Sequence, residues 1–182
     1  MVCQYFSTVK RKKNLRIIDI SNFKIKTLTS IKFFDRSFLI QSKDNIIFDT
    51  KKLKCVTKLK PNKKELAEIQ FAFNVCKHVK SNAIVISNNF STIGIGAGQP
   101  SRLDSCKIAV QKAKQFQSSK IKNSVAASDA FFPFADGINT LINAGIKTII
   151  QPGGSIRDQE VIDAANRLGI SMLFTGHRLF RH

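Results

Sequence analysis

The sequence lacks any apolar run long enough to cross a membrane. No stretch approaches the roughly 20 consecutive apolar residues that a spanning helix needs, and residues 1–13 lack the apolar segment of a secretory signal. The first 18 residues are basic and free of acid, a faint likeness to a transit peptide. With 43% hydrophobic residues among 182, we expect a soluble, cytoplasmic protein with one core, or one domain and a smaller appendage.

Cysteine is scarce and widely spaced. The four cysteines, Cys3, Cys55, Cys76 and Cys106, form no C-x-x-C pair, and no histidine stands at zinc-ligand spacing from them. This pattern excludes a zinc site and a disulfide framework. We therefore expect reduced cysteines with structural roles.

Acidic residues are few, 12 against 30 lysines and arginines, which gives a formal charge of +18. Seventeen of the 30 basic residues precede Glu65, in pairs and short runs without interleaved aromatics or a nucleic-acid-binding motif. A lysine-rich solvated surface is therefore favoured over a nucleic-acid interface. Attraction to anionic small molecules is compatible with both interpretations.

The chain divides near Pro61 into two parts of different character. Residues 1–60 contain short apolar runs typical of strands, at 15–18, 38–40, 46–48 and 55–56. Ser42 to Asn45 has the composition of a hairpin turn between the second and third runs. This part has little apolar content for a core, and we interpret it as the remnant of a preceding subdomain.

Residues 61–182 alternate helix and strand patterns and predict an α/β layered sheet. The expected strands are 83–86, 92–95, 124–127, 148–150 and 171–174. The expected helices begin at Asn62, at Ser101, after Asp136 and at Arg157, the last capped by Ser155 and ended by Gly169. In such a sheet the ligand site lies at the strand ends and the loops that follow them.

The glycine cluster from Gly94 to Gly98 follows an expected strand and precedes a helix. Its G-x-G-x-G spacing departs from the dinucleotide fingerprint, and the acid that would hold a ribose about 20 residues on is absent. Two interpretations stand level: backbone amides that cradle an anion, or glycines that permit a tight strand-to-helix connection.

Three other loops carry candidate chemistry. Residues 127–137 place three phenylalanines and a proline between Asp129 and Asp136, which indicates either a stacking platform for a planar ligand or core packing under a loop. Residues 151–155 form a glycine-containing loop before a helix. The ending 175–182 holds two arginines and two histidines; taken alone it is typical of a solvated tail, although arginine is the preferred phosphate ligand.

Together these loops resemble the transformylase domain of the bifunctional purine biosynthesis proteins, which combine phosphoribosylaminoimidazolecarboxamide formyltransferase with IMP cyclohydrolase. The motifs that carry the resemblance are Ser81-Asn82, residues 93–102, 127–134 and 150–158, and the terminal residues 178–182. The resemblance runs in order from about Asn14 to His182. It implies a cytidine-deaminase-like α/β/α fold and formyl transfer from 10-formyltetrahydrofolate to the 5-amino group of aminoimidazole carboxamide ribonucleotide (AICAR).

The resemblance also implies roles for ten residues. These are Asn82 beside the reacting amine and formyl groups, Arg102 and Asp136 on the folate pterin, Ser155 bordering the folate, Phe131 and Phe180 in the nucleotide site, Arg178 on its phosphate, His182 near the catalytic lysine, and Ser81 and Asp129 as ligands of a structural potassium ion. It implies a dimer, since the family's active sites form between two subunits. From the lack of long apolar runs we expect no membrane partner.

One departure from the family pattern is plain. The catalytic Lys-His pair of the family lies in a K-H-x-N-P-C-G motif, which these 182 residues lack; Lys77-His78 lies within a helix pattern without the following residues. We therefore expect the binding half of a formyltransferase, either truncated or complemented by a second chain, and inactive without the missing part. The alternatives are a non-enzymatic binding or assembly subunit and, less favoured, a nucleic-acid-binding module.

Overall fold

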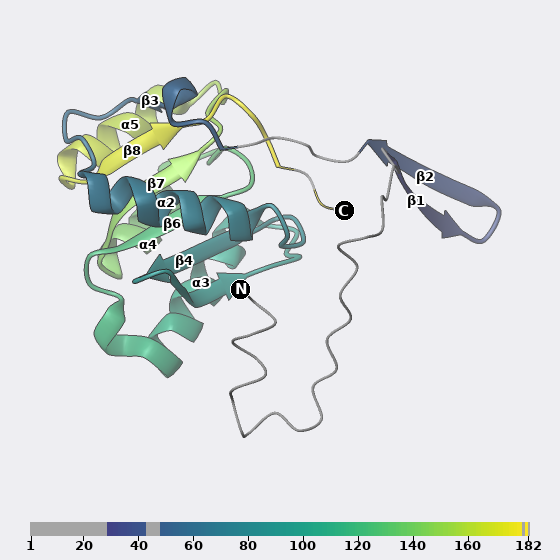
Figure 1. Ribbon diagram of the computed structural model, residues 1–182, viewed down its shortest axis with the longest axis horizontal. Coiled ribbons are helices and arrows are strands. Elements are labelled where there is room, and N and C mark those ends of the chain that lie inside the picture. The colour runs from purple at the N-terminus through teal and green to yellow at the C-terminus, as the bar shows by residue number, and fades with distance from the viewer. Residues whose placement is uncertain (1–28, 43–47, 180, 182) are drawn as a thin grey trace, which may run out of the picture. The chain divides into compact units, whose positions relative to one another are not determined.

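The computed structural model describes residues 29–42, 48–179 and 181, and the chain falls into two compact units, Met1–Lys43 and Asp44–His182. The larger unit therefore begins before the boundary predicted between residues 60 and 61. The reason is a strand pairing: the short strand β3 (Lys54–Cys55) hydrogen-bonds antiparallel to the last strand, β8 (Ser171–Phe174), as the edge of the main sheet (Figure 1).

The smaller unit contains an antiparallel hairpin, β1 (Thr29–Phe34) and β2 (Ser37–Ser42). Its turn passes through Asp35, whose φ of 43° lies in the left-handed region that Asp tolerates. The predicted strand at 38–40 is thus confirmed, but its partner is β1 rather than residues 46–48. Residues 43–47, where most of the expected turn and second strand fall, lie outside the described residues, as does the expected strand at 15–18.

The larger unit is built on a six-stranded mixed sheet in the order β3-β8-β7-β6-β4-β5. Strands β6, β7 and β8 are parallel, whereas β4 runs antiparallel to both β6 and β5. The remaining strand bounds are β4 (Ile84–Asn88), β5 (Ser91–Gly96), β6 (Ser124–Ser128) and β7 (Ile146–Gln151). All five strands predicted after residue 61 are confirmed.

Helices cover both faces of this sheet. Helix α2 (Lys63–Cys76) packs against β4, β6 and β7, and its apolar side meets Val85, Val125 and Ile150. The opposite face carries α3 (Arg102–Gln117), α4 (Ala135–Asn143) and α5 (Asp158–Arg167), whose buried side chains meet Ile84, Ile86, Ala126 and Ile149. Alternate strand residues thus feed two cores, as period-2 geometry requires, and the predicted α/β/α layering is confirmed (Figure 1).

Helices α2 and α3 start at their predicted capping residues, whereas α4 and α5 do not. Helix α4 begins at Ala135, before the predicted start after Asp136, and its N-cap residue Phe134 makes no side-chain capping hydrogen bond. Asn62 and Glu65 form the predicted capping box, and Ser101 accepts from the Asp104 backbone N–H. Ser155 does not cap α5: its Oγ accepts from the Arg157 N–H at 3.2 Å, and the helix begins one residue later at Asp158. Ser155 thus closes a turn before the helix rather than starting it.

Gly94 and Gly96 let α3 lie directly on β5. A Cβ at Gly94 would come within 2.1 Å of the Ala109 carbonyl oxygen, and one at Gly96 within 1.9 Å of the Ser105 carbonyl oxygen. Only Gly98 of this cluster has a positive φ, 66°. The structure therefore supports close strand-to-helix packing for the first two glycines, and a turn at the third.

A buried carboxylate supports the β4–β5 turn. Glu68 of α2 is 5% exposed and accepts hydrogen bonds from the Ser87 hydroxyl at 2.7 Å and the Phe90 backbone N–H at 2.9 Å. Asn89 and Phe90 both have positive φ, 51° and 52°. Because a bulky residue rarely adopts this conformation, the Glu68 carboxylate compensates part of its conformational cost.

Candidate functional site

A cavity of about 470 Å³ opens where four separate parts of the chain meet. Asn82 precedes β4, residues 100–103 follow β5 and begin α3, and residues 130–137 follow β6, which ends at Ser128. Arg178, beyond β8, completes the lining. The cavity therefore lies at the strand ends predicted for a ligand, and five predicted site residues line it: Asn82, Arg102, Phe131, Asp136 and Arg178.

One wall of the cavity is aromatic. Phe131 and Phe134 line it, with Phe134 47% exposed. The Arg178 guanidinium carbon lies 4.3 Å from the centroid of the Phe131 ring, and that of Arg157 lies 4.7 Å from the Phe134 ring, both within cation–π range. Such a wall offers flat apolar surface bordered by cationic groups, which suits a planar, anionic ligand.

The phenylalanines of the loop that follows β6 differ in burial, and the core-packing interpretation is confirmed for Phe132. Phe132 is 1% exposed and packs in the core below the cavity, and its backbone N–H donates to the buried Gln151 Oε1 at 2.9 Å. Phe131 and Phe134 face the cavity. Gly137, at the start of α4, has no room for a Cβ, which would lie 2.9 Å from the Phe132 ring.

An ion pair lies under the polar side of the cavity. Arg102 Nη1 donates to Asp129 Oδ1 at 2.6 Å and to Ser128 Oγ at 2.7 Å, and the side chains of the pair are 7% and 1% exposed. Arg102 Nη2 donates to Asn82 Oδ1 at 2.7 Å. A buried pair of this kind requires all its hydrogen bonds to offset desolvation. Removal of either partner would leave an uncompensated buried charge.

The C-terminal tail is held against the sheet rather than solvated. The Leu179 N–H donates to the Asp129 carbonyl at 2.8 Å, and the Ser81 N–H donates to the Arg181 carbonyl at 3.0 Å. Leu179 is 2% exposed and packs in the α2-side core. These contacts hold Arg178 in the cavity lining and correct the expectation of a solvated tail.

The two residues that resemble potassium ligands lie at this tail junction. Ser81 Oγ accepts from the Arg181 N–H at 3.3 Å. Asp129 Oδ2 is buried and has no hydrogen-bond partner among the described residues. An orphaned, anionic oxygen fits an oxygen-ligated cation such as potassium. Within the same residues, no group of three or more His, Cys, Asp or Glu side chains suits a transition metal.

The other predicted site residues stand as follows. Ser155 lies in the loop before α5 and is absent from the cavity lining, although its neighbour Arg157 covers Phe134. Phe180 and His182 lie outside the described residues. The sequence reasoning missed Ser128, which joins Arg102 to the Ala130 carbonyl; its only signal was its position beside Asp129.

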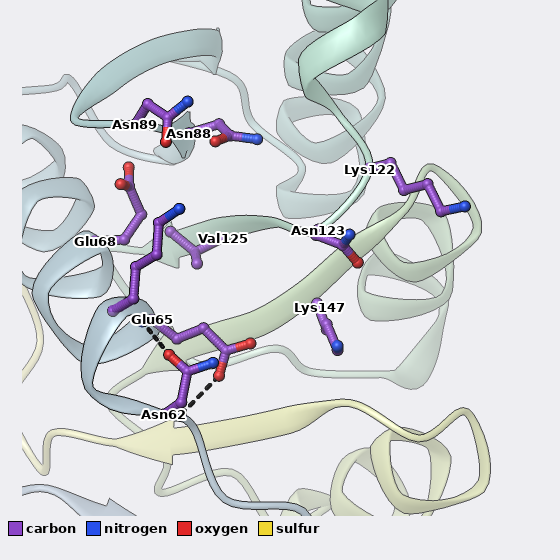
Figure 2. Close-up of a pocket in the computed structure, with 10 residues that line it drawn as sticks. Asn62, Glu65, Glu68, Asn88, Asn89, Lys122, Asn123, Val125 and Lys147 are labelled. Carbon is purple, nitrogen blue, oxygen red and sulfur yellow. Dashed lines mark hydrogen bonds between the residues drawn. The ribbon is translucent and has the colours of Figure 1, made fainter.

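A second cavity, of about 390 Å³, lies at the other ends of β6 and β7, and none of the predicted site residues lines it. Figure 2 shows Asn62 and Glu65 joined by their capping hydrogen bonds, and Lys122 and Lys147 extending away from Asn88. Its acidic side chains already serve the α2 cap and, through Glu68, the β4–β5 turn. These roles are structural.

The described cysteines are free, as expected. Burial raises the pKa of Cys106 to about 12, and burial, reinforced by the nearby Asp129 carboxylate, raises the pKa of Cys76 further. Both are therefore neutral thiols at physiological pH, without nucleophilic character. Within the described ranges, no helix has the length and apolar character to cross a lipid bilayer.

The fold and cavity define an α/β domain with a cavity at the strand ends. The family described as AICARFT/IMPCHase bienzyme matches residues 4–112. Two relatives named bifunctional purine biosynthesis protein PurH, from Bartonella bacilliformis and Aquifex aeolicus, are 50% and 48% identical over 96% of this chain, which covers 34% and 33% of them. The chain belongs to the AICARFT/IMPCHase bienzyme family and spans about a third of the length of these relatives.

A solved structure, a diaminohydroxyphosphoribosylaminopyrimidine deaminase/5-amino-6-(5-phosphoribosylamino)uracil reductase from Thermotoga maritima, is 15% identical with a TM-score of 0.41. It aligns over 60% of this chain and 35% of its own.

Proposed function

We propose that this chain forms the substrate-binding part of a formyltransferase of purine biosynthesis, which moves the formyl group of 10-formyltetrahydrofolate to the 5-amino group of AICAR. The observation that carries the proposal is the meeting of Asn82, Phe131 and Arg178 in one cavity, because family membership alone does not bring these residues together. In this proposal Arg178 holds the nucleotide phosphate, and Phe131 packs on the planar imidazole.

The folate takes the Phe134 side of the cavity. Asp136 lines this part and accepts from the Gly137 N–H through Oδ1 at 2.6 Å, which leaves carboxylate capacity for the N–H donors of a pterin. Arg157, which follows the Ser155 loop, lies over the Phe134 ring and supplies positive charge for the anionic folate tail. The excess of basic residues, 30 against 12 acidic, favours the approach of both anionic ligands.

The reaction needs groups that these 182 residues do not supply. The amine nitrogen attacks the formyl carbon to give a tetrahedral intermediate; the nitrogen loses a proton to a general base, the bond to folate N10 breaks, and N10 takes up a proton. The intermediate's oxyanion also needs a donor. In the proposal these groups come from a Lys-His pair outside this sequence, on a longer chain or a complementing chain, within a dimer whose second subunit adjoins the site.

The proposal includes a structural potassium ion. Asp129, whose buried Oδ2 has no hydrogen-bond partner among the described residues, and Ser81 would be its ligands. When bound, it would neutralise charge beneath the tail. The chain's own residues do the rest: Asp129 holds Arg102 with its other oxygen and the Leu179 N–H with its carbonyl.

Isothermal titration with AICAR tests the proposal. Saturable binding is expected for the wild-type chain, and Arg178→Ala should weaken it at least tenfold, because hydrogen bonds to a charged group contribute about 1.5–3 kcal/mol. Arg167→Ala, on the exposed end of α5, is the matched control and should bind as wild type. No binding by a folded chain would contradict the proposal and favour a non-enzymatic assembly subunit.

A further inference from the structure

The side-chain amide of Asn82 is held in one orientation by its neighbours. Its Nδ2 donates to the Gln99 carbonyl at 2.8 Å and to the Pro100 carbonyl at 3.0 Å, and its Oδ1 accepts from Arg102 Nη2 at 2.7 Å. A guanidinium only donates and a carbonyl only accepts, so the flipped amide would oppose like partners at all three contacts. The orientation is therefore fixed by chemistry.

Arg102 is itself fixed from behind. Its Nη1 donates to Asp129 Oδ1 at 2.6 Å and to Ser128 Oγ at 2.7 Å, while the Ser128 hydroxyl donates onward to the Ala130 carbonyl at 2.7 Å. The Asp129 side chain is 1% exposed and that of Arg102 7%. Arg102 is thus the donor to both Asp129 and Asn82, through different nitrogens of its guanidinium group. The single ammonium nitrogen of a lysine does not have this planar, two-armed geometry.

The consequence for the cavity concerns what Asn82 can offer a ligand. Both of its amide protons are donated inside the protein, and Asn82 still lines the cavity. Only acceptor capacity remains, at the second lone pair of Oδ1. A ligand group that meets Asn82 must therefore bring an N–H or O–H, and a developing oxyanion would find no donor there.

We propose that Arg102 is a positioning residue that holds Asn82 as a pure hydrogen-bond acceptor for the attacking amine of the nucleotide. This inference rests on the proposed function. Asn82 accepts one N–H of the amine and so directs the nitrogen lone pair; the proton released on attack leaves to a base elsewhere, and Asn82 gains no proton. The donor that stabilises the oxyanion must then be a group other than Asn82. This role of Arg102 does not exclude a contact between Arg102 and the folate.

Hydrogen exchange of the Asn82 side-chain amide, followed by NMR, tests the positioning without any ligand. In the wild-type chain we expect exchange at least tenfold slower than for the exposed Asn89, since tenfold corresponds to about one hydrogen bond's net free energy. Arg102→Lys should remove most of this protection while the fold, checked by circular dichroism, persists. Arg167→Lys is the matched control and should change nothing. Unprotected Asn82 in the wild type, or full protection in a folded Arg102→Lys chain, overturns the proposal.

A second titration tests the acceptor role, and its main comparison uses only the wild-type chain. AICAR should bind the wild-type chain about tenfold more tightly than the analogue in which hydrogen replaces the 5-amino group, because Asn82 Oδ1 loses its partner in the analogue. Arg102→Lys should reduce this preference more than it weakens binding of the analogue. Equal binding of both nucleotides refutes the acceptor role. If neither binds, the proposed function fails, while the amide exchange still decides the positioning.

Discussion

Replacement of Gly96 by alanine tests the packing on which the cavity rests. The added Cβ would lie 1.9 Å from the Ser105 carbonyl oxygen and 2.6 Å from the Ser105 carbonyl carbon. Ordinary contact begins near 3.4 Å, so α3 must move away from β5 by roughly 1.5 Å. Because both partners are backbone, no rotamer change relieves the overlap. We expect a loss of about 3 kcal/mol in the free energy of unfolding, the upper part of the usual overpacking range.

Urea unfolding followed by circular dichroism measures this loss, and a thermal midpoint lowered by about 6–12 °C should accompany it. Gly98→Ala is the matched control: its Cβ has open space beyond a flexible lysine chain, and only the positive φ of 66° costs it about 1–2 kcal/mol. The Ser105 hydroxyl also donates to the Asn82 carbonyl at 2.9 Å, so Gly96→Ala should weaken AICAR binding. A Gly96→Ala chain as stable as Gly98→Ala would refute the packing argument.

Two further predictions concern buried groups. Glu68→Gln replaces one of the two carboxylate oxygens that accept from the Phe90 N–H by an amide NH2 group, which cannot accept. We expect the free energy of unfolding, measured in urea, to fall by about 2 kcal/mol. An unchanged midpoint would contradict the role assigned to Glu68. Because burial raises the pKa of Cys106 from 9.0 to about 12, the unfolded thiol ionises first and stability falls between these pH values. Between these pH values, the free energy of unfolding should fall with pH less steeply in Cys106→Ala than in the wild type, by up to about 1.4 kcal/mol per pH unit. Equal slopes in the two proteins would refute the assigned effect of Cys106 burial.

The order of helices and strands after Pro61 could be predicted from local signals. The Asn62–Glu65 box and Ser101 supply hydrogen bonds within four residues of each helix start, and apolar strands such as 84–88 carry their own pattern. Where a strand's partner lies far along the chain, local signals failed, since β3 joins a sheet partner more than 100 residues away. The hairpin failed for another reason: the strand at 37–42 pairs with the residues that precede it, 29–34, and not with the apolar run that follows it.

The candidate site divides in the same way. Its residue types were evident from loops that resemble the family, including Asn82, Phe131 and Arg178, because chemistry-bearing motifs persist in the sequence. Their meeting depends on the docking of the tail through Leu179 and on the antiparallel β4–β6 pairing, which bring together groups about 100 residues apart.

By itself, the sequence determined the alternation of helices and strands, the scarcity of acid and the residue types of the site, because these follow from near-neighbour hydrogen bonds and composition. Only the tertiary structure decided that Gly96 serves helix packing and that both amide protons of Asn82 are donated within the protein. These properties depend on which backbone atoms lie within about 3 Å, and chain folding alone sets such distances.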